Sequence, residues 1–194
     1  MRADAWGHGA RFVAHSAIEA GAAGVLADRA GAAALSDVVD PRRVLGAGDT
    51  LDADAVFGLS GTTTPVMSAH GWVVSLKALR TGEGVSYGYT HRATRDTTVA
   101  LVTGGYAQGI VRALGNTASV TIAGRRHPIV GRVAMDVCVV DVGDSVVARG
   151  DEVAFFGDPR TGAPAIEEWL RATGFSAAEL TAAVGLHAAR EYGP

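Results

Sequence analysis

The sequence predicts an α/β region followed by a larger region built on β-strands. Residues 1–60 alternate short apolar runs with amphipathic stretches, as βα units around a parallel sheet do. Residues 61–194 are rich in Val, Thr and Gly, with turn signals at short intervals, until a helical tail begins near Ile166. The composition changes at residues 62–65, and residues 60–64 with Pro65 are typical of a linker. We therefore predict two domains, residues 1–60 and 61–194.

The first region is predicted to contain two helices and three short strands. A helix over residues 9–20 would place Val13, Ala17 and Ala20 on one face, and Gly21 would terminate it. A second helix is expected over residues 31–39. Buried strands are expected over residues 24–27, 43–46 and 53–59.

The second region is predicted to form a closed β-barrel with helices at its end. Its β-branched runs, separated by glycines, predict strands over residues 72–79, 97–102, 118–122, 133–142 and 152–156. Many short strands at regular spacing are typical of a closed barrel. Residues 166–192 return to a helical pattern, in which Ser176 and Glu179 have the spacing of a capping box.

Composition excludes several classes of protein. The 194 residues have 48% hydrophobic residues and a net charge of −3, so they can bury a core in one or two domains. Charges of both signs without a basic run do not predict nucleic-acid binding. Cys138 stands alone in an apolar run, which excludes an internal disulfide and predicts a buried, inert thiol.

Targeting and metal-binding signals are also missing from the sequence. No apolar run approaches the ~18 residues of a membrane-spanning helix, and Arg2, Asp4 and His8 interrupt any signal peptide. We expect a soluble cytoplasmic protein that does not contact a membrane. Neither an HExxH nor a paired CxxC spacing occurs, so no metal is expected.

Four ordered motifs stand in the second region, and they carry a family resemblance. They cover residues 65–68 (PVMS), 82–88 (GEGVSYG), 105–109 (GYAQG) and 128–136 (PIVGRVAMD). Together they resemble the carboxy-terminal domain of alanine racemases. Residues 2–9 (RADAWGHG) resemble the turn that carries the family's cofactor lysine, and residues 54–59 resemble the last strand of its βα-barrel. The resemblance implies a truncated βα-barrel (TIM-barrel) remnant followed by an alanine-racemase-like β-barrel domain.

The resemblance also implies that the pyridoxal-phosphate site is lost. In the family a lysine amine forms a Schiff base with the cofactor, and Arg2 stands in its place. A guanidinium stays protonated and offers no free amine. The resemblance puts phosphate-contacting tyrosines at Trp6 and Ala178 and a cofactor-ring arginine near Leu51, and all three differ. We expect no cofactor, while His8 is expected to hold the turn.

On the opposite side of the site, the family's residues are retained. The resemblance assigns Tyr87 as a catalytic acid or base, delivered from one subunit into the barrel of its partner. A phenol, whose usual pKa is ~10, can act so if its surroundings lower that pKa, but a buried strand tyrosine is the alternative. Tyr106 corresponds to a substrate-entry residue. Met135 and Asp136 correspond to a pair that approaches the substrate carboxylate, although Asp136 also fits a simple turn residue.

His91 suggests a new acid–base pair. It follows Tyr87 by four residues, so in an extended segment both side chains would point to the same face. A surface histidine beside Arg92 is the alternative, because a lone histidine is a weak signal. Arg2 could bind an anionic group of a substrate.

Two functions from different classes follow from these residues. The first is a cofactor-free isomerase, epimerase or cyclase that moves protons on a small molecule through Tyr87, His91 and Asp136, with Arg2, Tyr106 and Met135 binding the substrate. The second is a non-catalytic pseudo-racemase that serves as a dimerisation or binding module. A residual racemase using pyridoxal phosphate and a decayed chain without function are further alternatives. Because a half-barrel exposes strand edges, we predict a homodimer in either case.

Overall fold

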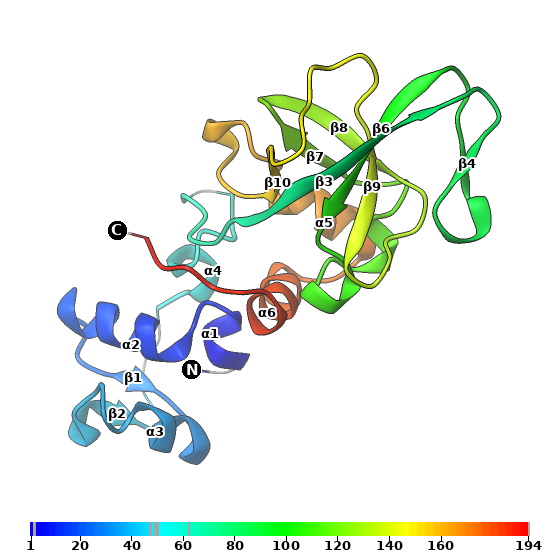
Figure 1. Cartoon of the computed structure of the whole chain (residues 1–194). Coiled ribbons are helices and arrows are strands. Elements are labelled where there is room, and N and C mark those ends of the chain that lie inside the picture. Colours follow the sequence, from blue (N-terminus) through cyan, green and yellow to red (C-terminus); the bar gives the residue numbers. More distant parts are fainter. Residues whose placement is uncertain (2, 47, 49–50, 62, 194) are drawn as a thin grey trace.

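The structure, a computed structural model, describes the chain except residues 2, 47, 49–50, 62 and 194. Figure 1 shows a small αβ region at the N-terminal end and a β-barrel at the other, with the last two helices beside both. None of the helices in the described part of the chain is long and apolar enough to cross a membrane.

The N-terminal region contains two parallel strands between short helices. In order, its elements are α1 (Ala3–Trp6), α2 (Ala10–Glu19), β1 (Val25–Leu26), α3 (Arg29–Leu35), η1 (Pro41–Arg43), β2 (Val44–Leu45) and α4 (Ala53–Val56). Strands β1 and β2 pair in parallel, as expected for βα units. A small core of Ala14, Val25, Leu35 and Val39 holds α2 and α3 against the strands.

Two expectations for this region need correction. The strand expected over residues 53–59 is wrong, because residues 53–56 form helix α4. The Asp52 carboxylate accepts a hydrogen bond from the Asp54 backbone N–H (3.1 Å), which satisfies a free donor of the first turn. The expected second helix starts earlier than predicted, since Asp28 caps α3 by accepting from the Gly31 N–H (2.8 Å).

The second region confirms the closed barrel. Its strands are β3 (Ala69–Leu79), β6 (Thr97–Thr103), β7 (Ser119–Ile122), β8 (Arg125–Val130), β9 (Val137–Asp141) and β10 (Glu152–Phe156). They close in the order β10-β3-β6-β9-β8-β7, and every neighbouring pair is antiparallel. Strand β8 was not predicted. It forms a hairpin with β7 whose two-residue turn has φ of +49° at Ala123 and +73° at Gly124.

A two-stranded arm leaves the barrel between β3 and β6. It consists of β4 (Gly84–Val85), η2 (Tyr87–Tyr89) and β5 (His91–Arg92), and we call residues 84–92 the arm (Figure 1). Its base packs on the outside of the barrel in a separate apolar cluster of Leu79, Val85, Ala93, Val99 and Val130.

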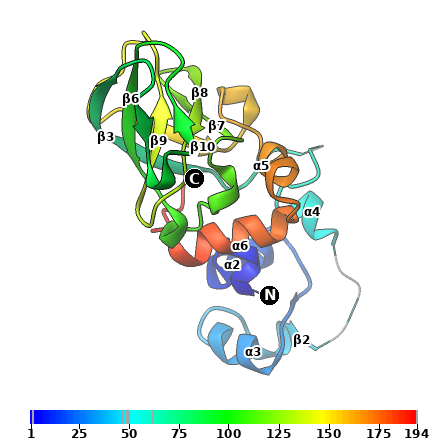
Figure 2. The same cartoon turned by 90° about the vertical axis from the view of Figure 1, so that its right-hand side faces the viewer.

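Two helices at the C-terminal end connect the regions. They are α5 (Ile166–Thr173) and α6 (Ala177–His187), preceded by η3 (Tyr106–Gln108), η4 (Arg112–Leu114) and η5 (Pro159–Thr161). The predicted capping box of Ser176 and Glu179 is confirmed at the start of α6. Helix α6 lies beside the N-terminal helices in both views (Figure 2). A Cβ added to Gly185 of α6 would lie 2.0 Å from the Gly7 carbonyl oxygen, so the two backbones touch.

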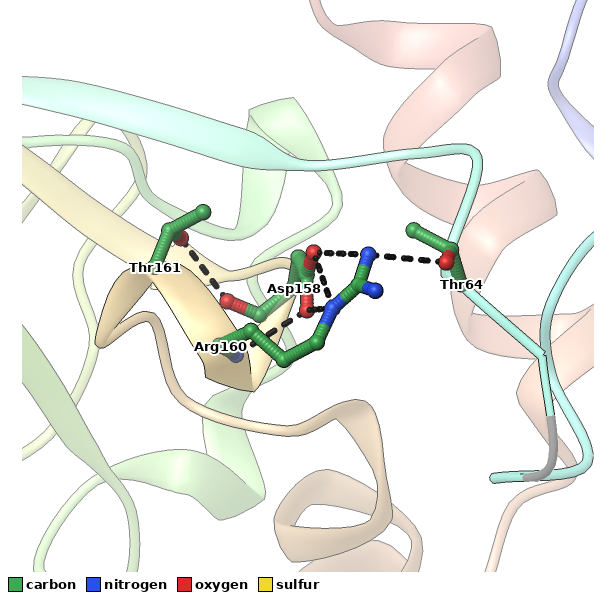
Figure 3. Close-up of polar contacts among 4 residues, drawn as sticks. All are labelled: Thr64, Asp158, Arg160 and Thr161. Carbon is green, nitrogen blue, oxygen red and sulfur yellow. Dashed lines mark hydrogen bonds and ion pairs between the residues drawn. The ribbon is translucent and has the colours of Figure 1, made fainter.

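The expected linker is tied to the loop after β10 (Figure 3). Arg160 donates to the Thr64 hydroxyl oxygen (2.8 Å) and to the Asp158 carboxylate (2.7 Å). The Thr161 hydroxyl donates to the Asp158 carbonyl oxygen (2.8 Å). Arg160 also holds the pKa of Asp158 below its usual value. The chain therefore enters the barrel from a fixed point just before Pro65.

Candidate functional site

Two loops of the barrel bring three of the predicted site residues together. The Tyr106 N–H donates to the Ala134 carbonyl (3.0 Å), and the Ala107 N–H donates to the Met135 carbonyl (2.9 Å). The Gly104 N–H donates to the Asp136 carbonyl (2.9 Å). These backbone bonds join the loops before η3 and before β9. Tyr106, Met135 and Asp136 consequently lie on one end of the barrel.

The side chains at this end are held by polar contacts that the sequence did not reveal. The Gln108 amide nitrogen donates to Asp136 Oδ1 (3.1 Å), while Gln108 Oε1 accepts from the Gly105 N–H (3.0 Å). The Arg112 guanidinium lies 4.6 Å from the centre of the Tyr106 ring, within reach of a cation–π interaction. Arg112 lies outside the four motifs, so no sequence signal pointed to it. Asp136 thus faces a neutral amide rather than a cation.

Tyr87 lies at the tip of the arm and is open to solvent. The Ser86 hydroxyl donates to the Arg132 carbonyl (2.5 Å), which fixes the arm to the loop that leads to Met135. Tyr87 itself is 71% exposed, so it is not the buried strand tyrosine that was the alternative. Two cavities, of about 220 and 370 Å³, lie between the arm and the barrel, and Tyr87 lines neither.

The spacing argument that paired His91 with Tyr87 is wrong. It assumed an extended segment, but residues 87–89 form the tight turn η2, with φ of +75° at Gly88 and +45° at Tyr89. His91 lies on β5 opposite Val85, half-buried rather than on the surface. Its Nε2 atom is buried and has no hydrogen-bond partner among the described residues. A role for His91 in proton transfer remains a prediction.

The N-terminal turn has an uncommon backbone conformation. Arg2 lies outside the described residues, so its predicted role as a substrate ligand is not addressed by the structure. From Ala3 to Trp6 every φ lies between +46° and +56°, a left-handed turn that costs about 1–2 kcal/mol per residue for L-amino acids. Asp4 stabilises it, because its carbonyl accepts from Gly9 (2.9 Å) and its carboxylate from the Ala10 N–H (2.7 Å).

His8 holds this turn, as the sequence predicted. Its Nδ1 lies 3.0 Å from the Ala5 carbonyl and 3.1 Å from the Trp6 carbonyl, so this nitrogen carries the proton and donates. The ring stacks on Phe57 with centroids 4.2 Å apart. Burial lowers the pKa of His8, which keeps the imidazole neutral.

The three positions that the resemblance assigns to the cofactor side, Trp6, Leu51 and Ala178, lie in separate parts of the structure. Trp6 packs beside Phe57 in the N-terminal turn, with centroids 5.8 Å apart. Leu51 is 77% exposed in the loop before α4, and Ala178 is half-buried at the start of α6. The only lysine in the sequence, Lys77, lies on β3 and lines both cavities beneath the arm.

Two further kinds of reactive group were predicted from the sequence to be absent or inert, namely metal ligands and the single thiol. Within the described residues, no group of three or more His, Cys, Asp or Glu side chains is placed to hold a metal ion. Cys138 is buried on β9, and desolvation raises the pKa of its thiol to about 12. It is the inert thiol that the sequence predicted.

Comparison with known proteins identifies the family of the barrel domain that carries these loops. Residues 66–192 match the family described as alanine racemase, C-terminal domain. The chain belongs to the alanine racemase family. The alanine racemase of Frankia casuarinae is 41% identical over 148 residues, which are 76% of this chain and 38% of that protein. The alanine racemase of Mycobacterium avium is 45% identical over 124 residues, covering 59% of this chain and 32% of that protein.

Solved structures agree with this assignment. Alanine racemase from Streptomyces lavendulae superimposes with a TM-score of 0.60 and 36% identity, over 62% of this chain and 32% of that one. Alanine racemase from Bacillus anthracis gives a TM-score of 0.62 and 29% identity, over 68% and 36% respectively. This chain therefore spans about a third of the length of these racemases. The predicted resemblance and the barrel fold are confirmed, whereas the division at residue 60 stays a prediction.

Proposed function

We propose that this chain is a racemase-derived assembly module that forms a homodimer. Its contact surface is the tyrosine face, defined as Tyr87, Tyr106, Met135 and Asp136. The observation that carries the proposal is the 71% exposure of Tyr87 at the arm tip, away from either cavity. Sites that bind a small molecule tightly are concave and bury most of its surface, so the open Tyr87 needs a second surface before it can help to form such a site.

A second copy of the chain offers such a surface. By family resemblance, the tyrosine of one subunit enters the barrel of its partner, and the counterpart here is the N-terminal region of the second copy. That region exposes the apolar side chains of Leu45, Leu51 and Val56. It also carries the two-stranded sheet of β1 and β2, in which each strand pairs with only one other strand among the described residues, whereas proteins usually cover or pair the outer edges of a sheet.

Light scattering after gel filtration tests the homodimer directly. The double variant Tyr87→Ser, Met135→Asp removes an aromatic anchor and places a charge on the tyrosine face. An anchor of this kind contributes at least ~2 kcal/mol, so we expect dissociation to be favoured by about 30-fold or more. Val146→Asp is the matched control, because Val146 is 94% exposed in the loop before β10. A wild-type chain that is monomeric at every concentration would contradict the proposal.

The proposed loss of pyridoxal phosphate rests on the distribution of amines. Covalent attachment in this family chemistry requires a lysine amine in the N-terminal turn. The residues of that turn contain no lysine, and Lys77 belongs to the barrel. The turn therefore does not fit a covalently held cofactor, and its left-handed backbone packs against α6.

A second candidate is a cofactor-free isomerase, epimerase or cyclase acting on a small molecule at the same dimer contact. It is favoured by the buried, unpartnered Nε2 of His91 and by the placement of Asp136 beside Tyr106. Incubation with amino acids in D₂O distinguishes the two candidates. An enzyme of this kind that acts on amino acids would introduce deuterium at the α-carbon and would lose this activity in Tyr87→Phe or Asp136→Asn. The assembly module would introduce none.

A further inference from the structure

A hydrogen-bonded serine, histidine and glutamate lie where the start of β3 pairs with β10, and the proposed function uses none of them. Ser68 and His70 are two residues apart where β3 begins, so their side chains share a face. His70 Nε2 lies 2.8 Å from Ser68 Oγ. His70 Nδ1 forms an ion pair or hydrogen bond with Glu152 Oε1, which β10 supplies.

The proton positions in this cluster follow from its acceptors. An ionised carboxylate only accepts hydrogen bonds, so in the neutral tautomer of His70 that bonds to Glu152 it is Nδ1 that carries the proton. Nε2 then has a free lone pair, and the Ser68 hydroxyl donates to it. This is the order of groups that activates a serine nucleophile: hydroxyl, imidazole base and orienting carboxylate.

We propose that Ser68, His70 and Glu152 form a surface triad that hydrolyses small activated acyl esters. Ser68 Oγ attacks the ester carbonyl while His70 Nε2 takes the hydroxyl proton. The bond to the leaving alkoxide or phenoxide then breaks, and His70 returns the proton to it. Water attacks the acyl-serine in the same way, and Ser68 recovers its proton. The net reaction consumes one ester and one water and yields one carboxylic acid and one alcohol or phenol.

The surroundings limit which esters can react. The side chains of His70 and Glu152 are 39% and 54% exposed, so substrates reach them without any opening step. The Gly157 backbone approaches Ser68, since a Cβ added there would lie 3.0 Å from Ser68 Cβ. Its N–H, however, already donates to the Pro164 carbonyl (2.9 Å) and does not serve an oxyanion. Without that stabilisation, only esters with good leaving groups, such as short aryl esters, should be hydrolysed.

Two probes test the triad on the whole chain: p-nitrophenyl acetate hydrolysis and labelling by a fluorophosphonate, with the modified residue located by mass spectrometry. We expect the label on Ser68, and no label on this peptide in Ser68→Ala. His70→Gln should slow hydrolysis about 100-fold, the lower range for a general base. Glu152→Gln should slow it about fivefold, because an exposed carboxylate contributes little.

Glu152 is a positioning residue, so Glu152→Asp should recover part of the rate that Glu152→Gln loses. His15→Gln is the matched control, because His15 also faces a glutamate, Glu19, at 3.4 Å. This variant should hydrolyse and label like the wild type. Hydrolysis by Ser68→Ala at the wild-type rate, or labelling confined to another residue, would overturn the triad.

Discussion

Replacing Gly185 with alanine tests the contact between α6 and the N-terminal turn. A Cβ at this position would lie 2.0 Å from the Gly7 carbonyl oxygen and 2.5 Å from its carbon, and both are backbone atoms that cannot rotate away. Overpacking of this kind costs up to about 3 kcal/mol. Alanine regains about 1 kcal/mol of helix propensity within α6. The expected net loss of unfolding free energy is therefore about 2 kcal/mol.

Urea denaturation and thermal melting, both followed by circular dichroism, measure this loss. For a chain of this size, 2 kcal/mol corresponds to a melting temperature lower by about 4–8 °C. Gly46→Ala is the control, because no atom of the described residues lies within 4 Å of its added Cβ, and it should change stability by less than ~0.5 kcal/mol. If Gly185→Ala is as stable as the wild type or more stable, the added methyl group causes no overpacking and only the gain in helix propensity affects the free energy of unfolding. The packing of α6 on the turn would then be refuted.

Four further measurements follow from single side chains. Burial lowers the pKa of His8, so protonation of this imidazole favours the unfolded state. The contribution of neutral His8 to the free energy of unfolding is therefore fully present above pH ~6.5, and it falls as the pH drops towards the folded-state pKa. His8→Gln should flatten this fall by up to ~1.4 kcal/mol per pH unit in urea denaturation between pH 7 and 5. Trp169→Ala should lower the free energy of unfolding by about 3–5 kcal/mol in the same assay at pH 7, because the indole is fully buried against Phe156. A loss below ~1 kcal/mol would contradict this packing. Ser86→Ala removes the hydrogen bond to the Arg132 carbonyl, so limited proteolysis should cut the arm faster. The free energy of unfolding of the whole chain should fall by only about 1 kcal/mol or less. Unchanged cleavage would show that the bond does not hold the arm. Titration with pyridoxal phosphate should produce no stable Schiff-base absorbance band. A saturable band of one cofactor per chain in the wild type would argue against the loss of the cofactor site, and its disappearance in Lys77→Arg would assign it to that lysine.

The barrel was predictable because its strands carry their signal locally. Runs of β-branched residues marked β3, β6, β7 and β10 within a few residues of their observed ends. Strand β8 was missed because its first half is Arg125, Arg126 and His127, and a polar start gives no strand signal. Its pairing depends on the hairpin turn with β7. Helix α4 was misassigned because an apolar run was given more weight than the cap supplied by Asp52.

The candidate site was only partly predictable for a similar reason. The motifs placed Tyr106, Met135 and Asp136 near one another, and backbone hydrogen bonds between their loops do join them. The relation between Tyr87 and His91 depended on a local conformation that Gly88 changes. The cluster of Ser68, His70 and Glu152 depends on strand pairing between distant segments, so no spacing in the sequence could have revealed it.

The left-handed turn is fastened by residues from the far end of the chain. Arg190 forms an ion pair with Asp4, and Tyr192 stacks on Phe12 with centroids 4.3 Å apart. A ribosome makes the turn at residues 3–6 long before it makes these two side chains. Since the turn is strained on its own, it gains its full set of contacts only when synthesis reaches residue 192. The turn is thus made long before the contacts that order it, and a nascent chain stalled before Arg190 should expose residues 3–6 to proteases.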